Sequence, residues 1–291
     1  MTDKQRDPAE GAGPQSMGHE WDGIEELNNP LPRWWLWTFY ATILFAIGYC
    51  VVYPAIPMLH SATPGVSGWS SRGQLAAETA QAEAARAQMT AQLASVDIST
   101  LDPASPLMRA AVEGGRAAFR INCVQCHGSG AAGSKGYPNL NDDDWLWGGT
   151  MAEIHQTIAH GIRQPDDADT RLSQMPAFGR DGILQPAEID DVVSFVRNAA
   201  RLEGASASAR RGAALFETNC AVCHGANAKG GREFGAPDLT DAIWLYGSDR
   251  EALTQTIANA RYGVMPAWAH RLDPATINML TAYVHQLGGG E

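Results

Sequence analysis

A run of twenty residues from Trp34 to Tyr53 contains no charged side chain. As a helix rising about 1.5 Å per residue it is about 30 Å long, which matches the hydrocarbon thickness of a bilayer. Tryptophans crowd its start and tyrosines stand toward its end, as is typical of membrane interfaces. A signal peptide has a short apolar region close behind a basic start, whereas a polar, acid-containing stretch comes first here. The pattern predicts an uncleaved single-pass anchor over residues 34–59.

Charged residues around the anchor indicate its orientation. Lys4, Arg6 and Arg33 precede the apolar run, and the first Lys or Arg after it is Arg72. Because basic residues are retained on the cytoplasmic side, residues 1–33 are predicted to form a cytoplasmic tail and the rest of the chain to lie outside. The run also contains no Asp, Glu, Lys, Arg or His, so the anchor itself offers no titratable proton path.

Residues 60–107 are predicted to link the anchor to the remainder of the chain. Residues 61–71 are rich in Ser, Gly and Pro and indicate a loop. The stretch from Arg72 to Ser95 is dominated by Ala, Gln and Glu, which favour helix. Its small apolar surface favours a solvated spacer over part of a core.

Beyond residue 107 the chain repeats itself. Residues Phe119, Cys123, Cys126 and His127 return 97 positions later as Phe216, Cys220, Cys223 and His224. The sequence Met-Pro-Ala-aromatic occurs at Met175 and again at Met265. The repeat predicts two domains of one small fold, residues 108–203 and 204–291. Apolar spacing predicts helices near 151–162, 186–201, 250–260 and 274–287, and no strand alternation is persuasive, so the fold class is mainly α.

Each repeat carries a Cys-x-x-Cys-His motif, Cys123 to His127 and Cys220 to His224. On a helical turn, cysteines at i and i+3 and a histidine at i+4 share one face. Two thiols can then bond the vinyl groups of a porphyrin while the imidazole reaches the iron, which predicts two covalently bound haem c groups. A redox dithiol would require a strand–helix pattern, and a zinc site would require four converging ligands.

The sixth iron ligand separates an electron carrier from a catalyst. Met175 and Met265 lie 48 and 41 residues beyond the motif histidines, in matching loops. A His/Met haem is closed to substrate and has a raised potential, so we predict that both methionines bind iron. Histidines at 155 and 160 in the first repeat and at 270 and 285 in the second are rival ligands, which leaves a bis-histidine first haem open.

Other residues are predicted to support the haems. The carbonyls of Pro138 and Pro237 are placed to accept the free N–H of the motif histidines, which raises ligand basicity. Arg163 and Arg261 are candidates to pair with haem propionates, with exposed surface arginines as the alternative.

The net charge of −11 argues against nucleic acid as a partner, since a phosphate-binding chain requires a basic face. An acidic balance suits a cationic protein partner better. The densest acidic run, Asp142 to Asp144, is either a solvated loop or a docking patch for a basic cytochrome.

Two stretches before the span, residues 19–24 (His-Glu-Trp-Asp-Gly-Ile) and 28–35 (Asn-Asn-Pro-Leu-Pro-Arg-Trp-Trp), carry a family resemblance. Together with residues 68–73 (Gly-Trp-Ser-Ser-Arg-Gly) and the two haem-motif repeats, the chain resembles the dihaem subunit of the cbb3-type cytochrome c oxidases over essentially its whole length. The resemblance implies one N-terminal transmembrane helix and two tandem class I cytochrome c domains.

The family resemblance also implies a role for the chain. Electrons would pass from a cytochrome c through the two haems to the monohaem and catalytic subunits of a terminal oxidase in the bacterial inner membrane, with the haem domains in the periplasm. It implies that the first haem is held by Cys123, Cys126, His127 and Met175. It implies that the second haem is held by Cys220, Cys223, His224 and Met265.

The subunit would not be catalytic alone. Alternatives are a dihaem electron carrier for another respiratory complex, and a dihaem peroxidase. A peroxidase needs an open haem and a distal acid–base residue, and the paired Met-Pro loops argue against it.

Overall fold

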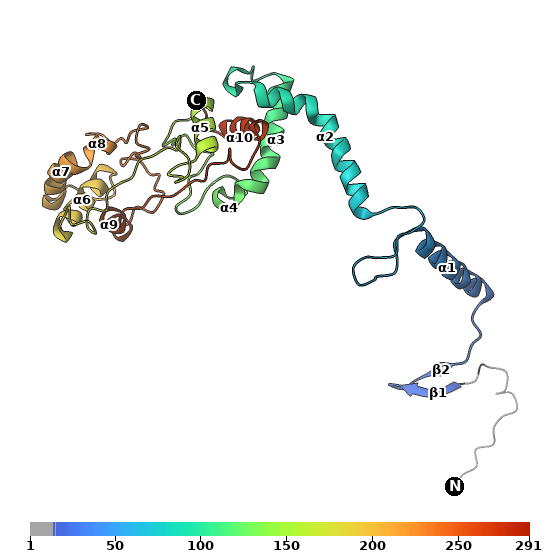
Figure 1. Ribbon diagram of the computed structural model, residues 1–291. Coiled ribbons are helices and arrows are strands. Elements are labelled where there is room, and N and C mark those ends of the chain that lie inside the picture. The colour runs from blue at the N-terminus through green and yellow to red at the C-terminus, as the bar shows by residue number, and fades with distance from the viewer. Residues whose placement is uncertain (1–13, 15) are drawn as a thin grey trace, which may run out of the picture. The chain divides into compact units, whose positions relative to one another are not determined.

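The computed structural model describes residue 14 and residues 16–291, in two compact units, 1–84 and 85–291. Lys4 and Arg6, on which part of the orientation argument depends, lie outside the described residues. The mainly helical class is confirmed (Figure 1). The first unit begins with a hairpin, β1 (Ser16–Trp21) and β2 (Ile24–Leu27), which the sequence analysis missed. Its turn is Asp22-Gly23, with both residues at positive φ, as tight hairpin turns prefer.

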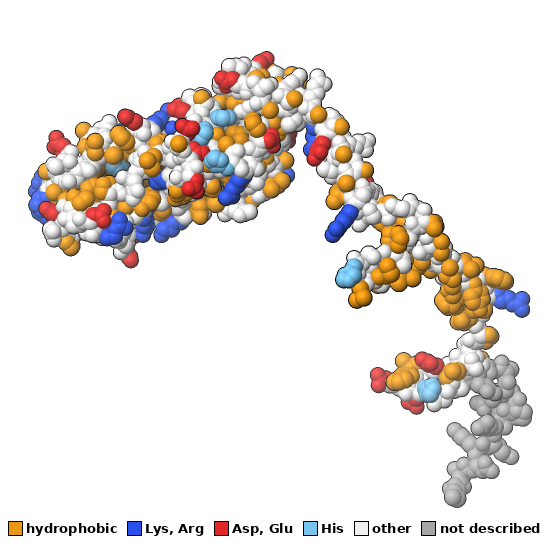
Figure 2. All heavy atoms as spheres, in the orientation of Figure 1, with side chains coloured by type: hydrophobic (Ala, Val, Ile, Leu, Met, Phe, Trp, Pro, Cys, Tyr) orange, Lys and Arg blue, Asp and Glu red, His pale blue; other side chains and the backbone are white. Residues whose placement is uncertain are grey.

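Helix α1 (Arg33–Val52) coincides with the apolar run Trp34–Tyr53, shifted by one residue, and ends seven residues before the predicted end of the anchor at residue 59. It is long and apolar enough to cross a membrane, and none of its residues is buried. Figure 2 shows hydrophobic side chains covering it. After Pro54 the chain folds back, and Val66 N–H and Ser67 Oγ donate to the carbonyls of Val51 and Val52 at 3.0 and 2.7 Å, which satisfies open carbonyls of the last turn. The protein is therefore membrane-anchored.

Helix α2 (Ser71–Ser95) confirms the predicted helix but corrects the prediction that it is a solvated spacer throughout. Leu93 is fully buried, packed with Met108 and Ala282. The buried side chain of Asn278 donates to the carbonyl of Leu93 at 2.7 Å and to that of Val96 at 3.1 Å. The last turns of α2 thus belong to the second unit's core.

The second unit contains eight further α-helices and one short 3-10 helix, η2 (Ile98–Thr100). The helices are α3 (Pro106–Asn122), α4 (Val124–His127), α5 (Met151–His160), α6 (Pro186–Ala199), α7 (Ala207–Asn219), α8 (Ala221–His224), α9 (Arg250–Asn259) and α10 (Pro274–His285). The four helices predicted from apolar spacing are confirmed, each ending one or two residues early. Proline in the first turn begins α3, α6 and α10, where its missing N–H costs nothing.

The packing of these helices differs from the predicted division into domains 108–203 and 204–291. Helix α10, the last of the second repeat, packs on α3 and α5 of the first (Figure 1). Helix α6, the last of the first repeat, packs on α7 and α9 of the second. The two repeats have exchanged their final helices, so each hydrophobic core draws on both halves of the sequence.

Equivalent glycines permit both helix crossings. A Cβ on Gly115 of α3 would collide with the carbonyl of Met279 on α10. A Cβ on Gly212 of α7, 97 residues later, would collide with the carbonyl of Asp191 on α6. Close approach of two backbones requires the absence of a side chain at the contact. The same crossing therefore occurs twice, each time between different repeats.

Candidate functional site: two paired haem sites

Each Cys-x-x-Cys-His motif forms a single helical turn. Cys123 and Cys220 precede α4 and α8, and the N–H groups of His127 and His224 donate to their carbonyls at 2.9 and 3.0 Å. All five cysteines lie in the described part of the chain and are free. Burial, with a smaller contribution from the partner thiol of each motif, raises the pKa of Cys123 and of Cys220 to about 11. Both motifs thus present two thiols and an imidazole on one turn, as attachment to a porphyrin requires.

The motif histidines are held by the two proline carbonyls that the sequence analysis singled out. His127 Nδ1 lies 3.2 Å from the Pro138 oxygen, and His224 Nδ1 lies 3.3 Å from the Pro237 oxygen. Because a carbonyl only accepts, Nδ1 carries the proton and Nε2 keeps its lone pair for a metal. Burial lowers the pKa of both histidines, against the opposing effect of the carbonyl. Both imidazoles are therefore favoured in the neutral form that ligates iron.

The Met265 loop lies at the first motif, not the second. Met265 exchanges backbone hydrogen bonds of 2.9 and 3.0 Å with Ile162, just after α5. Trp268 N–H donates to the carbonyl of Ile158 at 3.1 Å. The Met265 side chain packs in the cluster that contains Phe119 and, at its edge, Cys123.

The Met175 loop is bound to the second motif in the same way. Phe178 N–H donates to the carbonyl of Ile257 at 3.1 Å, where α9 is about to end. Met175 packs against the cluster that contains Cys220. The packing of the two methionine loops thus favours the opposite pairing to the sequence-based one, Met265 with His127 and Met175 with His224.

The residues packed around the second motif fit a haem. Among the described residues, the buried Nε1 of Trp244 is the one buried side-chain N or O atom without a hydrogen-bond partner. Trp244 packs against the cluster of Cys220, and an indole N–H left buried and unpaired is costly. A haem propionate would accept this hydrogen bond. At the equivalent position of the first repeat, Trp145 Nε1 instead donates to the carbonyl of Gly289.

The two predicted propionate partners lie in the segments that cross between repeats. Arg163 donates from Nε to the carbonyl of Gly263 at 2.7 Å and from Nη1 to that of Ser173 at 2.9 Å. Burial lowers the pKa of Arg163. Arg261 lies over the ring of Tyr246, 5.6 Å from its centroid. Arg163 thus joins both crossing segments, a role that the sequence analysis did not foresee, and propionate binding by either arginine stays a prediction.

Three of the four rival histidines have ring nitrogens engaged elsewhere. His160 and His270 contact Asp167, and His285 Nε2 lies 3.1 Å from the carbonyl of Glu291. For His155, burial, reinforced by the charge of His160, lowers the pKa. The methionines pack against the clusters that contain or border the motif cysteines.

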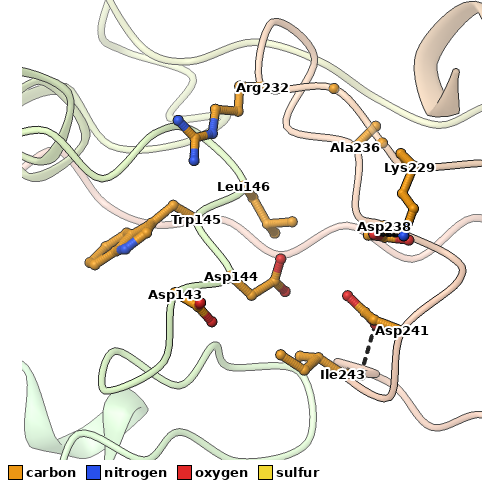
Figure 3. Close-up of a pocket in the computed structure, with 12 residues that line it drawn as sticks. Asp143, Asp144, Trp145, Leu146, Lys229, Arg232, Ala236, Asp238, Asp241 and Ile243 are labelled. Atoms are coloured by element: carbon orange, nitrogen blue, oxygen red, sulfur yellow. Dashed lines mark hydrogen bonds and ion pairs between the residues drawn. The ribbon is translucent and has the colours of Figure 1, made fainter. Parts of the chain in front are cut away.

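The acidic run faces a pocket of about 560 Å³ lined by both repeats. Asp144 and Asp241 point toward each other across it, one from each repeat (Figure 3). Burial, together with Asp241 and other nearby aspartates, raises the pKa of Asp144 to about 6. Asp143 is exposed, so the acidic run contains one partly enclosed carboxylate, that of Asp144, and one solvated carboxylate, that of Asp143. The docking-patch hypothesis stays a prediction.

We expect Asp144→Asn to stabilise the protein at neutral pH. The pKa of this carboxyl is near 3.8 in the unfolded chain and about 6 in the folded protein. The free-energy penalty for burying its charge is therefore absent below pH 4, grows between pH 4 and 6, and is constant above pH 6. Asparagine avoids that penalty, with an expected gain of about 1–3 kcal/mol above pH 6. Denaturant unfolding of the haem-loaded protein from pH 4 to 8 measures it, with Asp143→Asn as the matched control. An equal gain for both variants at every pH would contradict the expectation.

Comparison with known proteins identifies the family. The model described as "N-terminal domain of cytochrome oxidase-cbb3, FixP" matches residues 13–60, and "Cytochrome C oxidase, cbb3-type, subunit III" matches residues 110–196 and 207–284. The FixP subunit of the cbb3-type cytochrome c oxidase of Azorhizobium caulinodans is 52% identical, covering 98% of this chain and 97% of the relative. The CcoP subunit of Cereibacter sphaeroides is 50% identical over 96% of both chains, and FixP of Rhizobium meliloti is 49% identical over the full length of both. The chain therefore belongs to the family of cbb3-type cytochrome c oxidase subunit III, the FixP and CcoP proteins.

Proposed function

We propose that this chain is the electron-transfer subunit of a cbb3-type terminal oxidase and carries two covalently bound haem c groups. The first is held by Cys123, Cys126, His127 and Met265. The second is held by Cys220, Cys223, His224 and Met175. The observation that supports this assignment is the delivery of one methionine loop to each motif by helices exchanged between the repeats.

When bound, haem supplies one-electron chemistry at its iron. The residues of the chain keep that chemistry to electron transfer. Met265 and Met175 would each complete the ligand set of one haem, which would close the iron to substrate and raise its potential. The Pro138 and Pro237 carbonyls fix the histidine tautomer, and the buried clusters around Phe119 and Phe216 exclude water. These features favour a carrier over a peroxidase, which needs an open iron and a distal acid–base group.

The exchange gives the two sites a common scaffold. Met265 is linked to Ile162 by backbone hydrogen bonds. Arg163, which follows Ile162 in the chain, donates to the carbonyls of Gly263 and Ser173, one in each crossing segment. The two sites therefore share one framework of hydrogen bonds. A fixed relation between two redox centres suits electron transfer from one to the other.

We further propose that α1 packs against a larger membrane subunit, with the N-terminus cytoplasmic and residues 60–291 in the periplasm. Because α1 carries no ionisable acid or histidine, proton transfer and oxygen reduction belong to the partner subunits. The electron donor is a cytochrome c, and the acceptors are the monohaem and catalytic subunits. The relatives' names, which describe subunits of such an oxidase, support this assignment.

The test is oxygen consumption driven by reduced cytochrome c, measured on the tagged protein gently purified from its native membrane. We expect a cyanide-sensitive oxidase to co-purify. Met265→Ala should slow turnover without changing the oxygen affinity. If no oxidase co-purifies with the tagged protein and the preparation reduces peroxide or nitric oxide instead, the haems belong to another complex.

A further inference from the structure

A cluster of two histidines and two aspartates joins the repeats away from the haem motifs. His160 is the last residue of α5, Asp167 and Asp169 lie in the segment after it, and His270 lies between Met265 and α10. His160 Nδ1 is 3.1 and 3.3 Å from the two carboxylate oxygens of Asp167. His270 Nε2 is 3.1 Å from Asp167 Oδ2. One ligand atom from each of His160, Asp167 and Asp169 lies within 4.8 Å of the others.

The surrounding backbone holds these side chains in place. The Asp167 side chain is 6% exposed, and its Oδ1 accepts the N–H of Asp169 at 2.9 Å. Gln156 of α5 donates to the carbonyl of Asp169 at 2.9 Å. Ala269 N–H donates to the carbonyl of Ala159 at 3.1 Å, which sets His270 beside the end of α5. These hydrogen bonds position the Asp167 carboxylate and the backbone of Asp169, and they hold the loop of His270 beside α5.

The cluster is also accessible. A cavity of about 300 Å³ opens beside it, lined by Gln164, Asp166, Pro266, Ala267, His270 and Arg271. The His270 side chain is 60% exposed, whereas that of Asp167 is almost enclosed. His270 is therefore the side of the cluster that is open to solvent.

We propose that His160, Asp167 and Asp169 form a binding site for one divalent transition-metal ion, with Zn²⁺ the best match, and that His270, which contacts Asp167, supplies the fourth ligand. Neutral imidazole and carboxylate are ligands of zinc in proteins, and four such donors complete its coordination. Two carboxylates balance the charge of a divalent ion. Histidine disfavours Ca²⁺ and Mg²⁺, which take oxygen ligands, and the absence of sulfur from the donor set disfavours Cu⁺.

This site goes beyond the proposed function and does not depend on it. Its ligands come from α5, from the segment that leads to Met175, and from the loop that carries Met265. A bound ion would therefore fasten the exchanged loop of the second repeat onto the first. Without an ion, the same residues would form only a hydrogen-bonded contact between the two repeats.

The experiment is a calorimetric titration of the full-length, haem-loaded protein in detergent with ZnCl₂, after tag removal and chelator treatment. We expect one saturable site per chain. Asp167→Asn and His160→Gln should each weaken Zn²⁺ binding by at least about tenfold. His60→Gln, which removes an exposed histidine in the first unit, is the matched control and should leave binding unchanged.

Zinc K-edge absorption identifies the ligands. We expect nitrogen and oxygen neighbours with the signature of two imidazoles. Three results would overturn the proposal: sulfur in the coordination shell, zinc binding that survives Asp167→Asn, or no saturable binding. The cluster would then be a hydrogen-bonded contact only. If Asp167→Asn fails to load haem, the more exposed His270→Gln replaces it, and unchanged zinc binding there would count equally against the site.

Discussion

In a chain that carries only the first haem, Met265→Ala is expected to abolish the methionine–iron bond, whereas Met175→Ala is expected to leave it intact. The single-haem background is Cys220→Ser with Cys223→Ser, which prevents covalent attachment at the second motif. Met265 packs against the same cluster as Cys123, and Met175 packs against the cluster that contains Cys220. Loss of the thioether should lower the midpoint potential of the first haem by on the order of 0.1 V or more.

The measurement is the near-infrared charge-transfer band of the methionine–iron(III) bond, with a redox titration of the same samples. The mirror-image background, Cys123→Ser with Cys126→Ser, provides the matched control, because there Met175→Ala should remove the band and Met265→Ala should not. If the band follows Met175 in the chain that keeps the first haem, each repeat binds its own haem and the exchanged arrangement is wrong.

Much of this arrangement could be predicted from the sequence. The apolar run Trp34–Tyr53 gave the anchor almost to the residue, because length and absence of charge are sufficient criteria for a span. The helices of the repeats followed from apolar spacing and prolines. The proline carbonyls at 138 and 237 were identified because they recur at matching positions after each motif.

The exchange could not be predicted in this way. Helices α6 and α10 begin at proline and place apolar residues at the same spacing: Ile189, Val192 and Val196 in one, Ile277, Leu280 and Val284 in the other. The two helices carry the same apolar pattern, so local patterns do not distinguish exchanged from unexchanged packing. The choice depends on the segments between Ile162 and Met175 and between Asn259 and Met265, whose path is fixed by long-range backbone hydrogen bonds.

The first sequence repeat is expected not to fold alone. A fragment of residues 85–203 retains α3, α4, α5 and α6 but lacks α10, and α6 packs on α7 and α9 in the whole protein, so Phe119 and Ile158 lose Ile277, Leu280 and Val284 as partners. Burial of each such aliphatic side chain contributes about 1.5–3 kcal/mol. Three of them together are comparable to the whole stability of a typical domain, about 5–15 kcal/mol. We expect the fragment to lack a cooperative thermal transition and a His/Met haem spectrum.

A rearranged chain is the matched control, and it should fold. Ile162 and Met265 form an antiparallel pair, joined by backbone hydrogen bonds in both directions, so a Gly/Ser linker of about four residues can connect 162 to 265 as a hairpin loop does. The resulting protein, residues 85–162 followed by 265–291, contains α3, α4, α5 and α10 and one complete ligand set. Circular dichroism melting and the methionine–iron(III) band should both report a folded cytochrome. The reverse outcome, with 85–203 folded and the rearranged chain unfolded, would mean that each repeat is a self-contained domain.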